Sequence, residues 1–340
     1  MKKLKVFICL VLVIGISLQM FAQGAPESGD DGDLPNVTWK ISHTVNPGSV
    51  MDQTANKFKE YVEEASGGKF KVEVFHSGVL GWEREVLEAH QMGTIEASLP
   101  NVSPLAEFVP AYEVFNLPFL FQSPEHMIKA YSHPVMEKLN DAAKEAGFVI
   151  GAQFDATFRY PLYSGHPIKT VNDFKGMKFR TMGVPAHIDA YNALGANVVS
   201  MAFSEVYSAM QLGTVDGCEN NYDPLYAMNF HEVAKYISNL PVVASSHVII
   251  FSKKAFDKLP EEYQKIAMDG ARVAADYGNK IGIQAEEAAF NAMVAEGITP
   301  VLIDDFSPFM AATEGVSQKY LKKMEPWVQE LREVFISLAE

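Results

Sequence analysis

The chain has 340 residues, which is enough for two domains and for a hydrophobic core that needs no disulfide or metal. Hydrophobic residues make up 48% of it and charged residues 21%, a composition that excludes an intrinsically disordered protein. Acidic residues outnumber basic ones by 42 to 28, and the net charge of −14 argues against nucleic acid or an anionic membrane surface as a partner. An acidic protein of this kind can still bind a small anion through a few local cations.

The first 24 residues have the pattern of a secretory signal peptide. Three lysines among residues 2–5 precede an apolar run at residues 6–18, and small residues follow at 22–25. The run is short for a transmembrane helix. We therefore expect residues 1–24 to be a signal peptide that directs the protein to the periplasm. The alternative is the buried first helix of a cytosolic protein.

The cysteines and the segment after the signal peptide are consistent with a soluble exported protein. Cys9 and Cys218 are the only cysteines. Cys9 lies inside the apolar run, too early to carry a lipid, so we expect no lipid anchor and no internal disulfide. Residues 25–36 are small, acidic and rich in glycine and proline, which predicts an acidic linker.

From residue 37 onward, strand and helix patterns alternate, which predicts an α/β fold with a largely parallel sheet. Alternating apolar residues or short apolar runs mark the strands, and apolar residues at helical spacing mark the helices. The expected strands are 37–41, 70–75, 94–99, 148–154, 178–181, 197–200 and 214–218. The expected helices begin near residues 49, 83, 123, 134, 185, 204 and 260. The last of them runs to about residue 296 and is long enough to span two lobes.

Two short segments repeat the same turn from helix to strand. GTIEA at residues 93–97 matches GTVDG at residues 213–217, and an asparagine follows each of them, Asn101 in one case and Asn220 in the other. Ligands bind at the carboxyl ends of strands in open α/β sheets. We therefore expect these two ends to face each other across a cleft between two lobes. A chance similarity between two helix-to-strand turns is the alternative.

The sequence lacks the motifs of common catalytic and metal sites. It contains no nucleophile elbow, no Cys-x-x-Cys pair and no glycine-rich nucleotide loop, and its nine histidines lack metal-ligand spacing. We therefore predict no metal, no cofactor and no enzymatic activity. A secreted hydrolase or lyase that uses Glu83, Asp155 or Glu219 is the enzymatic alternative, and an adhesion or scaffolding protein is the structural one.

Arginines are rare, and two of them lie in apolar, strand-like surroundings. Only five of the 28 basic residues are arginine, and Arg159 and Arg180 fall in the segments FRYP and KFRT. A guanidinium is planar and permanently charged, and it binds a carboxylate through two parallel hydrogen bonds. These two arginines are therefore either anchors for a carboxylate ligand or members of internal salt bridges. Arg84 lies between two glutamates and is predicted to form an ion pair at a helix start.

Several motifs together resemble the substrate-binding proteins of TRAP (tripartite ATP-independent periplasmic) transporters, the DctP type. The most specific are FSEVY at residues 203–207 and VDGCEN at residues 215–220, and further matches are KGMKFR at 175–180 and NLPF at 116–119. The resemblance covers nearly all of the chain after the linker. It implies two α/β lobes, joined by hinge strands and a long lobe-spanning helix, that close on an organic acid.

The resemblance also implies which residues bind the ligand. Arg180 would form a salt bridge with the ligand carboxylate, Arg159 would add a second cationic contact, and Asn220 would hydrogen-bond the same end. Phe203 would form a wall of the site. Further contacts would come from Glu83, Asn101, His43, Thr44, Tyr222 and His247.

Departures from the family pattern bear on the identity of the ligand. Asn221 stands where many members have proline, and Thr181 and Met182 replace a common Val-Pro pair. The sequence Glu219-Asn220-Asn221 resembles members that take sugar acids. We therefore expect a uronate or an aldonate, with a C4-dicarboxylate or a 2-oxo acid as the alternative.

The same resemblance predicts the lobes and the partners. One lobe is expected from residues 37–156 and 246–285, and the other from residues 157–245 and 286–340. The protein would be a monomer in the periplasm that hands its organic acid to membrane permease subunits and binds no nucleic acid.

Overall fold

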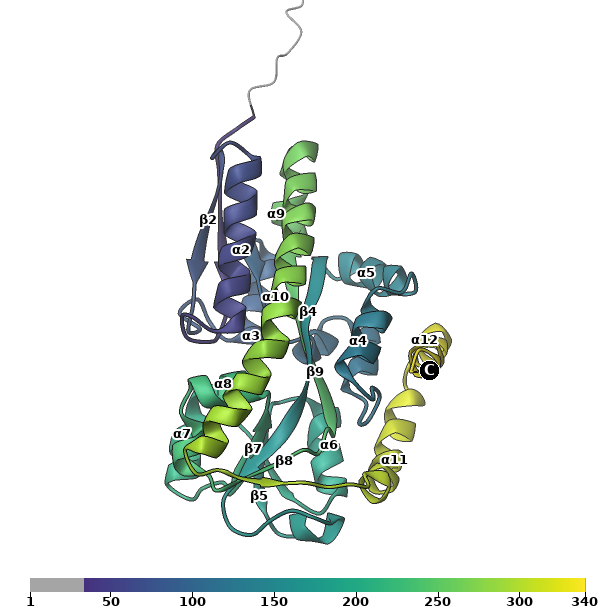
Figure 1. The fold of residues 1–340 in the computed structure, drawn as a ribbon. Coiled ribbons are helices and arrows are strands. Elements are labelled where there is room, and N and C mark those ends of the chain that lie inside the picture. Colours follow the sequence, from purple (N-terminus) through teal and green to yellow (C-terminus); the bar gives the residue numbers. More distant parts are fainter. Residues whose placement is uncertain (1–33, 340) are drawn as a thin grey trace, which may run out of the picture. The chain divides into compact units, whose positions relative to one another are not determined.

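The structure of the protein is a computed structural model that describes residues 34–339 (Figure 1). The predicted signal peptide at residues 1–24 and most of the predicted linker at 25–36 lie outside the described residues. From Asn36 onward the chain forms one compact unit. Within residues 34–339, none of the helices combines the length and the apolar character needed to cross a membrane.

The first lobe is built on a short parallel sheet. Strand β1 (Val37–Ser42) lies between β2 (Phe70–Phe75) and β3 (Ala97–Ser98) and pairs in parallel with both of them. The strands predicted at 37–41 and 70–75 are confirmed. The strand predicted at 94–99 is too long, because only Ala97 and Ser98 pair with β1 and with a later antiparallel strand.

Helices α2 (Val50–Ala65) and α3 (Glu83–Met92) connect these strands, as the sequence predicts. Ser49 caps α2, since its Oγ accepts a hydrogen bond from the Asp52 N–H at 3.3 Å. Helix α3 ends at Gly93, whose φ of 80° is a left-handed conformation that glycine adopts without steric cost. Local sequence thus sets both ends of this pair of helices.

Two long antiparallel strands carry the chain between the lobes. Strands β4 (Phe148–Tyr163) and β9 (Val243–Ser252) each have one end in the core of the first lobe and the other end in the core of the second. The register of this pair shifts between Phe154 and Thr157, and Asp155, which lies in that interval, has a φ of 55°. The sheet is therefore mixed rather than largely parallel. Hydrophobic periodicity indicates a strand but not the direction of its partner.

The second lobe contains a second parallel arrangement. Strand β5 (Lys178–Thr181) lies between β6 (Asn197–Ser200) and β7 (Gly217–Asn220) and is parallel to both. Strand β7 also pairs antiparallel with β4, so the strand order is β2-β1-β3-β9-β4-β7-β5-β6. The strand predicted at 214–218 is displaced to 217–220, because residues 214 and 215 bond back to the preceding helix as a turn. The elements of this lobe are β5 (Lys178–Thr181), α6 (Pro185–Ala193), β6 (Asn197–Ser200), α7 (Phe203–Gln211), β7 (Gly217–Asn220), α8 (Tyr222–Ala227), β8 (Tyr236–Ser238) and β10 (Thr299–Val301).

Shorter helices cover the two lobes (Figure 1). They are η1 (Ser103–Glu107), η2 (Pro110–Asn116), α4 (Pro124–Tyr131), α5 (Met136–Glu145), η3 (Val171–Phe174), η4 (Phe230–Val233), α9 (Lys253–Phe256), α11 (Ser307–Leu321) and α12 (Pro326–Ser337). Helix α12 packs on the core of the first lobe, where the ring of Phe335 lies 5.5 Å from that of Phe115 and 5.7 Å from that of Phe121. The predicted lobe boundaries, which assign residues 286–340 to the second lobe, stay a prediction.

The long helix α10 (Glu261–Ala295) joins the two lobes and confirms the lobe-spanning helix. It packs against α2, β4 and α8. A Cβ atom on Gly278 would lie 2.5 Å from Thr54 Oγ1, and one on Gly282 would lie 3.0 Å from Asp155 Oδ1. These two glycines therefore allow α10 to approach α2 and β4 more closely than any other residue would.

We expect the substitution Gly278→Ala to destabilise the protein by roughly 1–3 kcal/mol, because the added methyl group would overlap Thr54 and Phe154. Gly315→Ala is the matched control, since Gly315 is an exposed helical glycine on α11 and its Cβ would meet no atom within 4 Å. That control should stabilise the protein by about 0.5–1 kcal/mol. Chemical denaturation measures both values. Equal effects of the two substitutions would contradict a close contact at Gly278.

Candidate functional site

A cleft of about 370 Å³ lies where the carboxyl ends of strands from both lobes meet. Thr44, Glu83 and Asn101 line it from the first lobe. Arg159, Arg180, Phe203 and Asn220 line it from the other side, and His247 of β9 lies between the two groups. Eight of the ten residues predicted to bind the ligand are therefore brought together, and the expectation that Asn101 and Asn220 face a common cleft is met.

The structure does not bring the other two predicted residues into the cleft. His43 is buried and lies with Nε2 3.2 Å from Asp52 Oδ1, so its ring points to the start of α2 while the next residue, Thr44, faces the cleft. Burial lowers the pKa of His43, with Asp52 opposing this effect. Tyr222 stacks on Tyr160 with ring centroids 4.3 Å apart and lines a separate cavity. Neither side chain is therefore part of the lining of this cleft, and the predicted role of each in ligand binding stays a prediction.

Arg159 is held in a buried salt bridge. Its Nε donates to Glu219 Oε2, and its Nη2 donates to the Glu219 carbonyl oxygen at 3.0 Å. Thr181 Oγ1 donates to the other carboxylate oxygen of Glu219 at 2.6 Å. Strands β4 and β7 are neighbours, which places the two charged residues side by side. Of the two possibilities for the arginines, Arg159 is a member of an internal salt bridge, and its charge is compensated within the protein.

Arg180 pairs with no carboxylate in this way within residues 34–339. Its Nε and Nη2 both donate to the Met201 carbonyl oxygen, at 3.2 and 2.8 Å, and its guanidinium carbon lies 5.6 Å from the centre of the Phe203 ring. Its Nη1 is buried and has no hydrogen-bond partner among residues 34–339. Burial lowers the pKa of the guanidinium, and Glu219 opposes this effect, but an arginine keeps its charge in a protein. The cleft thus contains a buried cation with a free donor.

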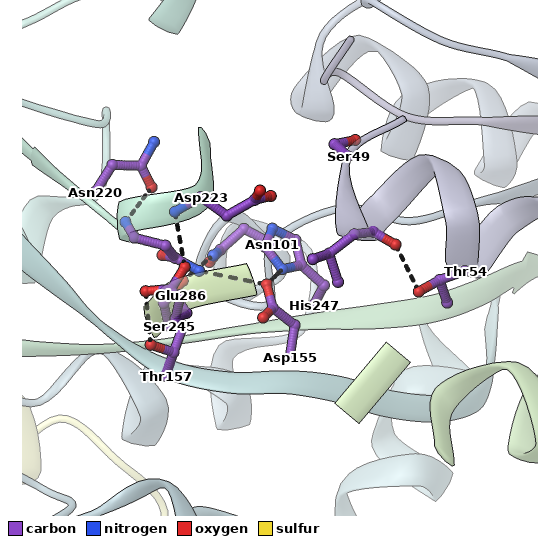
Figure 2. A network of polar contacts seen from close by, with 12 residues as sticks. Ser49, Thr54, Asn101, Asp155, Thr157, Asn220, Asp223, Ser245, His247 and Glu286 are labelled. Carbon is purple, nitrogen blue, oxygen red and sulfur yellow. Dashed lines mark hydrogen bonds and ion pairs between the residues drawn. The ribbon is translucent and has the colours of Figure 1, made fainter. Parts of the chain in front are cut away.

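The two asparagines differ in what they can offer a ligand. Both polar atoms of the Asn101 amide have partners inside the protein, since Oδ1 accepts from Ser103 N–H at 2.9 Å and Nδ2 donates to Ser245 Oγ at 3.0 Å. Asn220 Oδ1 accepts from Asn221 N–H at 3.0 Å, and no partner of its Nδ2 occurs in the described part of the chain. In Figure 2 this nitrogen points away from the network. The Asn220 amide can therefore donate to an anion bound at Arg180.

A network of carboxyl groups that the sequence does not reveal lies between the cleft and α10 (Figure 2). Asp155 Oδ2 accepts from His247 Nδ1 at 3.0 Å and from Asn221 Nδ2 at 3.3 Å. Glu286 accepts hydrogen bonds from two backbone N–H groups at the start of α8, at 3.0 and 2.9 Å. Burial, together with Asp155, raises the pKa of Asp223 to about 6 and that of Glu286 to about 8. In the sequence, Asp223 could have been noticed only because it follows two asparagines at the end of a strand, in the segment NNYD at residues 220–223.

Two further charged side chains at the cleft, Arg84 and Glu83, have partners within the protein. Arg84, which is exposed, donates from Nη1 to Glu107 at 2.7 Å and from Nε to Glu88 at 3.2 Å, so the predicted ion pair is present. Glu83 Oε1 accepts from the Asn101 N–H at 2.9 Å. Among residues 34–339, no group of three or more His, Cys, Asp and Glu side chains is arranged to hold a metal ion. The arrangement suits the binding of an organic anion by Arg180.

Comparison with known proteins agrees with this geometry. The family model "Bacterial extracellular solute-binding protein, family 7" matches residues 41–323. The C4-dicarboxylate-binding periplasmic protein DctP of Rhodobacter capsulatus is 31% identical over 77% of this chain and 79% of its own length. The chain therefore belongs to the bacterial extracellular solute-binding proteins of family 7, which serve TRAP transporters and are not enzymes.

Solved structures of relatives have the same fold. A TRAP periplasmic solute-binding protein from Sulfitobacter sp. NAS-14.1, with bound β-D-galacturonate, is 31% identical, covers 88% of this chain and 99% of its own, and gives a TM-score of 0.85. The corresponding protein from Roseobacter denitrificans, with bound β-D-glucuronate, is 29% identical with the same coverage and a TM-score of 0.86. The two-lobed α/β binding-protein fold predicted from the sequence is confirmed.

We expect Glu286 to make the protein less stable as the pH rises. Its carboxyl group, with a pKa of about 8 in the folded protein and about 4.5 when unfolded, binds a proton in the folded state that the unfolded chain releases. One such proton lowers the free energy of unfolding by up to about 1.4 kcal/mol per pH unit within that range. Residue 286 cannot titrate in Glu286→Gln. The free energy of unfolding of this variant, compared with that of the wild type at the same pH, should therefore rise by up to about 3 kcal/mol between pH 6 and pH 8.

Denaturant titrations at pH 6 and pH 8 measure this difference. The comparison between variant and wild type is the relevant quantity, because histidines titrate in the same range in both proteins. Glu287→Gln, at the exposed neighbouring position, is the matched control and should show no such change. A difference between Glu286→Gln and the wild type that is independent of pH would contradict the raised pKa.

Proposed function

We propose that this protein captures a sugar acid, a uronate or an aldonate, and delivers it to the membrane permease of a TRAP transporter. The observation that carries the proposal is the buried Arg180 guanidinium, whose Nη1 has no partner within residues 34–339 and whose side chain lines the cleft. An unpaired buried cation is stabilised by an anion that supplies the missing hydrogen bond. The relatives solved with galacturonate and glucuronate support this class of ligand.

The carboxylate end of the ligand would lie in the second lobe. Arg180 would provide the charge and Nη1, and Asn220 would donate from its free amide nitrogen. Arg159 also lines the cleft, but Glu219 compensates its charge, so it would contribute a polar wall rather than a second full cation. Phe203 would complete this end, since its ring lies beside the Arg180 guanidinium.

The rest of the cleft lining would favour hydroxyl groups over a second carboxylate. Glu83, Asp155 and Asp223 are part of this lining, and carboxylates accept hydrogen bonds from hydroxyls but repel another anion. The nearby cations are unavailable, since Arg84 binds two glutamates and burial lowers the pKa of His43. A C4-dicarboxylate or a 2-oxo acid is the alternative ligand. A carboxylate-processing enzyme is not supported by any arrangement of these residues.

We further propose that the two predicted lobes, residues 37–156 with 246–285 and residues 157–245 with 286–340, close around the ligand as a hinge. The strands β4 and β9 and the helix α10 are the connections about which they would move. A location in the periplasm, reached through the predicted signal peptide, a monomeric state and transient contact with permease subunits complete the proposal.

Substitution of Arg180 should weaken ligand binding without unfolding the protein. Loss of one partner from a desolvated charge pair costs on the order of 2–5 kcal/mol, so Arg180→Ala should bind its sugar acid roughly 30-fold or more weakly. Arg180→Lys keeps the charge but not the two-pronged geometry, so its affinity for the sugar acid should lie between those of the wild type and Arg180→Ala. Calorimetry measures the affinities.

Arg272→Ala is the matched control for this series. Arg272 is an exposed arginine on α10 that pairs with Asp269 at 2.8 Å, and its loss should leave the affinity within about twofold of wild type. Near wild-type affinity in Arg180→Ala would show that another residue anchors the carboxylate.

A thermal-shift screen of residues 25–340 should identify the ligand class, because a bound ligand stabilises the folded protein by mass action. Glucuronate, galacturonate and aldonates such as galactonate should raise the melting temperature more than succinate or malate. The physical reason is that cleft groups arranged for hydroxyls are left unpaired by a ligand without them. Stabilisation by C4-dicarboxylates alone would contradict the sugar-acid assignment and leave the role of Arg180 intact.

A further inference from the structure

Asn221 is the residue between strand β7 and helix α8, next to Asn220 in the chain. Its side chain is fully buried and is not part of the cleft lining, so it can act on a bound ligand only through other residues. It makes two hydrogen bonds that lead in different directions. Its backbone N–H donates to Asn220 Oδ1 at 3.0 Å, and its Nδ2 donates to Asp155 Oδ2 at 3.3 Å. Asn221 thus connects Asn220 of the cleft to strand β4.

The bond from the Asn221 N–H determines which end of the Asn220 amide is free. The oxygen and the nitrogen of an asparagine amide differ little in shape, and a rotation of the amide group exchanges them. With Oδ1 held by the Asn221 N–H, the nitrogen keeps its hydrogens for a ligand, and in Figure 2 it points away from the network. The reverse orientation would present an oxygen to a ligand carboxylate and repel it. The orientation of this amide therefore affects the affinity for an anion.

The acceptor of the Asn221 side chain is itself held in place. Asp155 lies where the pairing of β4 with β9 is interrupted, and its N–H donates to Asn279 Oδ1 of α10 at 2.8 Å. Its Oδ2 also accepts from His247 Nδ1 of β9 at 3.0 Å (Figure 2). Gly282 of α10 leaves room for this carboxylate, since a Cβ atom there would lie 3.0 Å from Asp155 Oδ1. Asp155 is therefore a fixed point to which the Asn221 side chain is bound.

A side chain that only filled this space would not need an amide. Asn221 Oδ1 is buried and has no hydrogen-bond partner among residues 34–339, which costs the folded protein stability. The amide does not cap α8 within the described part of the chain, and Glu286 accepts from the N–H groups of Tyr222 and Asp223 there. The bond from Nδ2 to Asp155 is thus what this amide contributes, and it holds the main chain beside Asn220.

We propose that Asn221 is a positioning residue that keeps the Asn220 amide with its nitrogen directed to the carboxylate of the ligand, and that Asp155 holds Asn221 in turn. This inference rests on the proposed function, because it takes the ligand carboxylate to lie at Arg180 and Asn220. It adds to that function a residue outside the cleft that sets the affinity for the acid group.

A double-mutant cycle with Asn220 tests the proposal, using residues 25–340 and D-galacturonate. Asn221→Ala keeps the backbone N–H but no longer holds it in place, so binding should weaken by about fivefold or more. Asn220→Ala removes the donor itself, and binding should weaken by roughly tenfold or more. The double variant should bind within about twofold of Asn220→Ala, since no amide is left to orient. Calorimetry measures the four affinities.

Asn239→Ala is the matched control for the loss of an asparagine that is bonded to the main chain. Asn239 accepts from the Ile303 N–H at 2.8 Å and donates to the Ile303 carbonyl oxygen at 3.2 Å, and it does not line the cleft. This variant should lose stability and keep its affinity for galacturonate within about twofold of that of the wild type.

NMR spectroscopy adds a measurement that a loss of stability alone would not change. The signals of the two Nδ2 hydrogens of Asn220 are identified by their absence in Asn220→Ala. In the wild type these signals should shift when galacturonate saturates the protein, because the hydrogens then bond to the carboxylate. In Asn221→Ala at saturation the shift should be clearly smaller, because the amide is no longer held in one orientation.

The outcomes separate this inference from the function on which it depends. Unchanged affinity in Asn221→Ala would overturn it, and so would an equal loss of affinity with and without Asn220. Wild-type affinity in Asn220→Ala would overturn the inference and leave the sugar-acid function in place. If the protein binds succinate and not galacturonate, the sugar-acid assignment fails. The same coupling measured with succinate would then support the role of Asn221, and its absence would overturn that role.

Discussion

The buried carboxylate of Glu219 determines how charge is distributed in the cleft. It lies on β7, between β4 with Arg159 and β5 with Arg180, so one carboxylate stands between two buried guanidinium groups. All of its oxygen atoms are used by Arg159 and Thr181. Arg180 is left with a main-chain carbonyl and an aromatic ring as partners. Because a buried charge without a counterion is costly, an anionic ligand bound at Arg180 would stabilise this site.

The elements that shape this site also connect the two lobes. Strand β4 carries Arg159 in its second half and Asp155 near its middle, at the point where its pairing with β9 is interrupted. Asp155 has a left-handed φ of 55°, which aspartate tolerates better than most residues, and its N–H donates to Asn279 of α10 at 2.8 Å. A change in the angle between the lobes would therefore act on the same residues that line the cleft, which links ligand contact to hinge geometry.

The lining of the cleft also contains several carboxyl groups. Asp155 of β4, Asp223 of α8 and Glu83 of α3 are among them, and the pKa values of Asp223 and Glu286 are raised because burial and the neighbouring Asp155 disfavour their ionised forms. The cleft thus combines a buried cation that has a free donor with several hydrogen-bond acceptors. This combination suits a molecule with one acid group and several hydroxyls.

The sequence by itself determined the local elements and the chemical types at the site. Caps such as Ser49 and Gly93, the apolar periodicity of α10 and the rare arginines in apolar segments act over a few residues, and so they can be recognised without a structure. The family motifs extended this to the two-lobed fold and to most residues of the cleft. Only the tertiary structure decided which arginine is compensated, because that depends on the pairing of strands whose charged residues are 60 positions apart. The same applies to the antiparallel direction of β9, to the burial of His43 against Asp52, and to the hydrogen bond from the Asp223 N–H to Glu286. Each is an interaction between segments that are brought together only by folding, and a pattern within one segment contains no information about the partner it will meet.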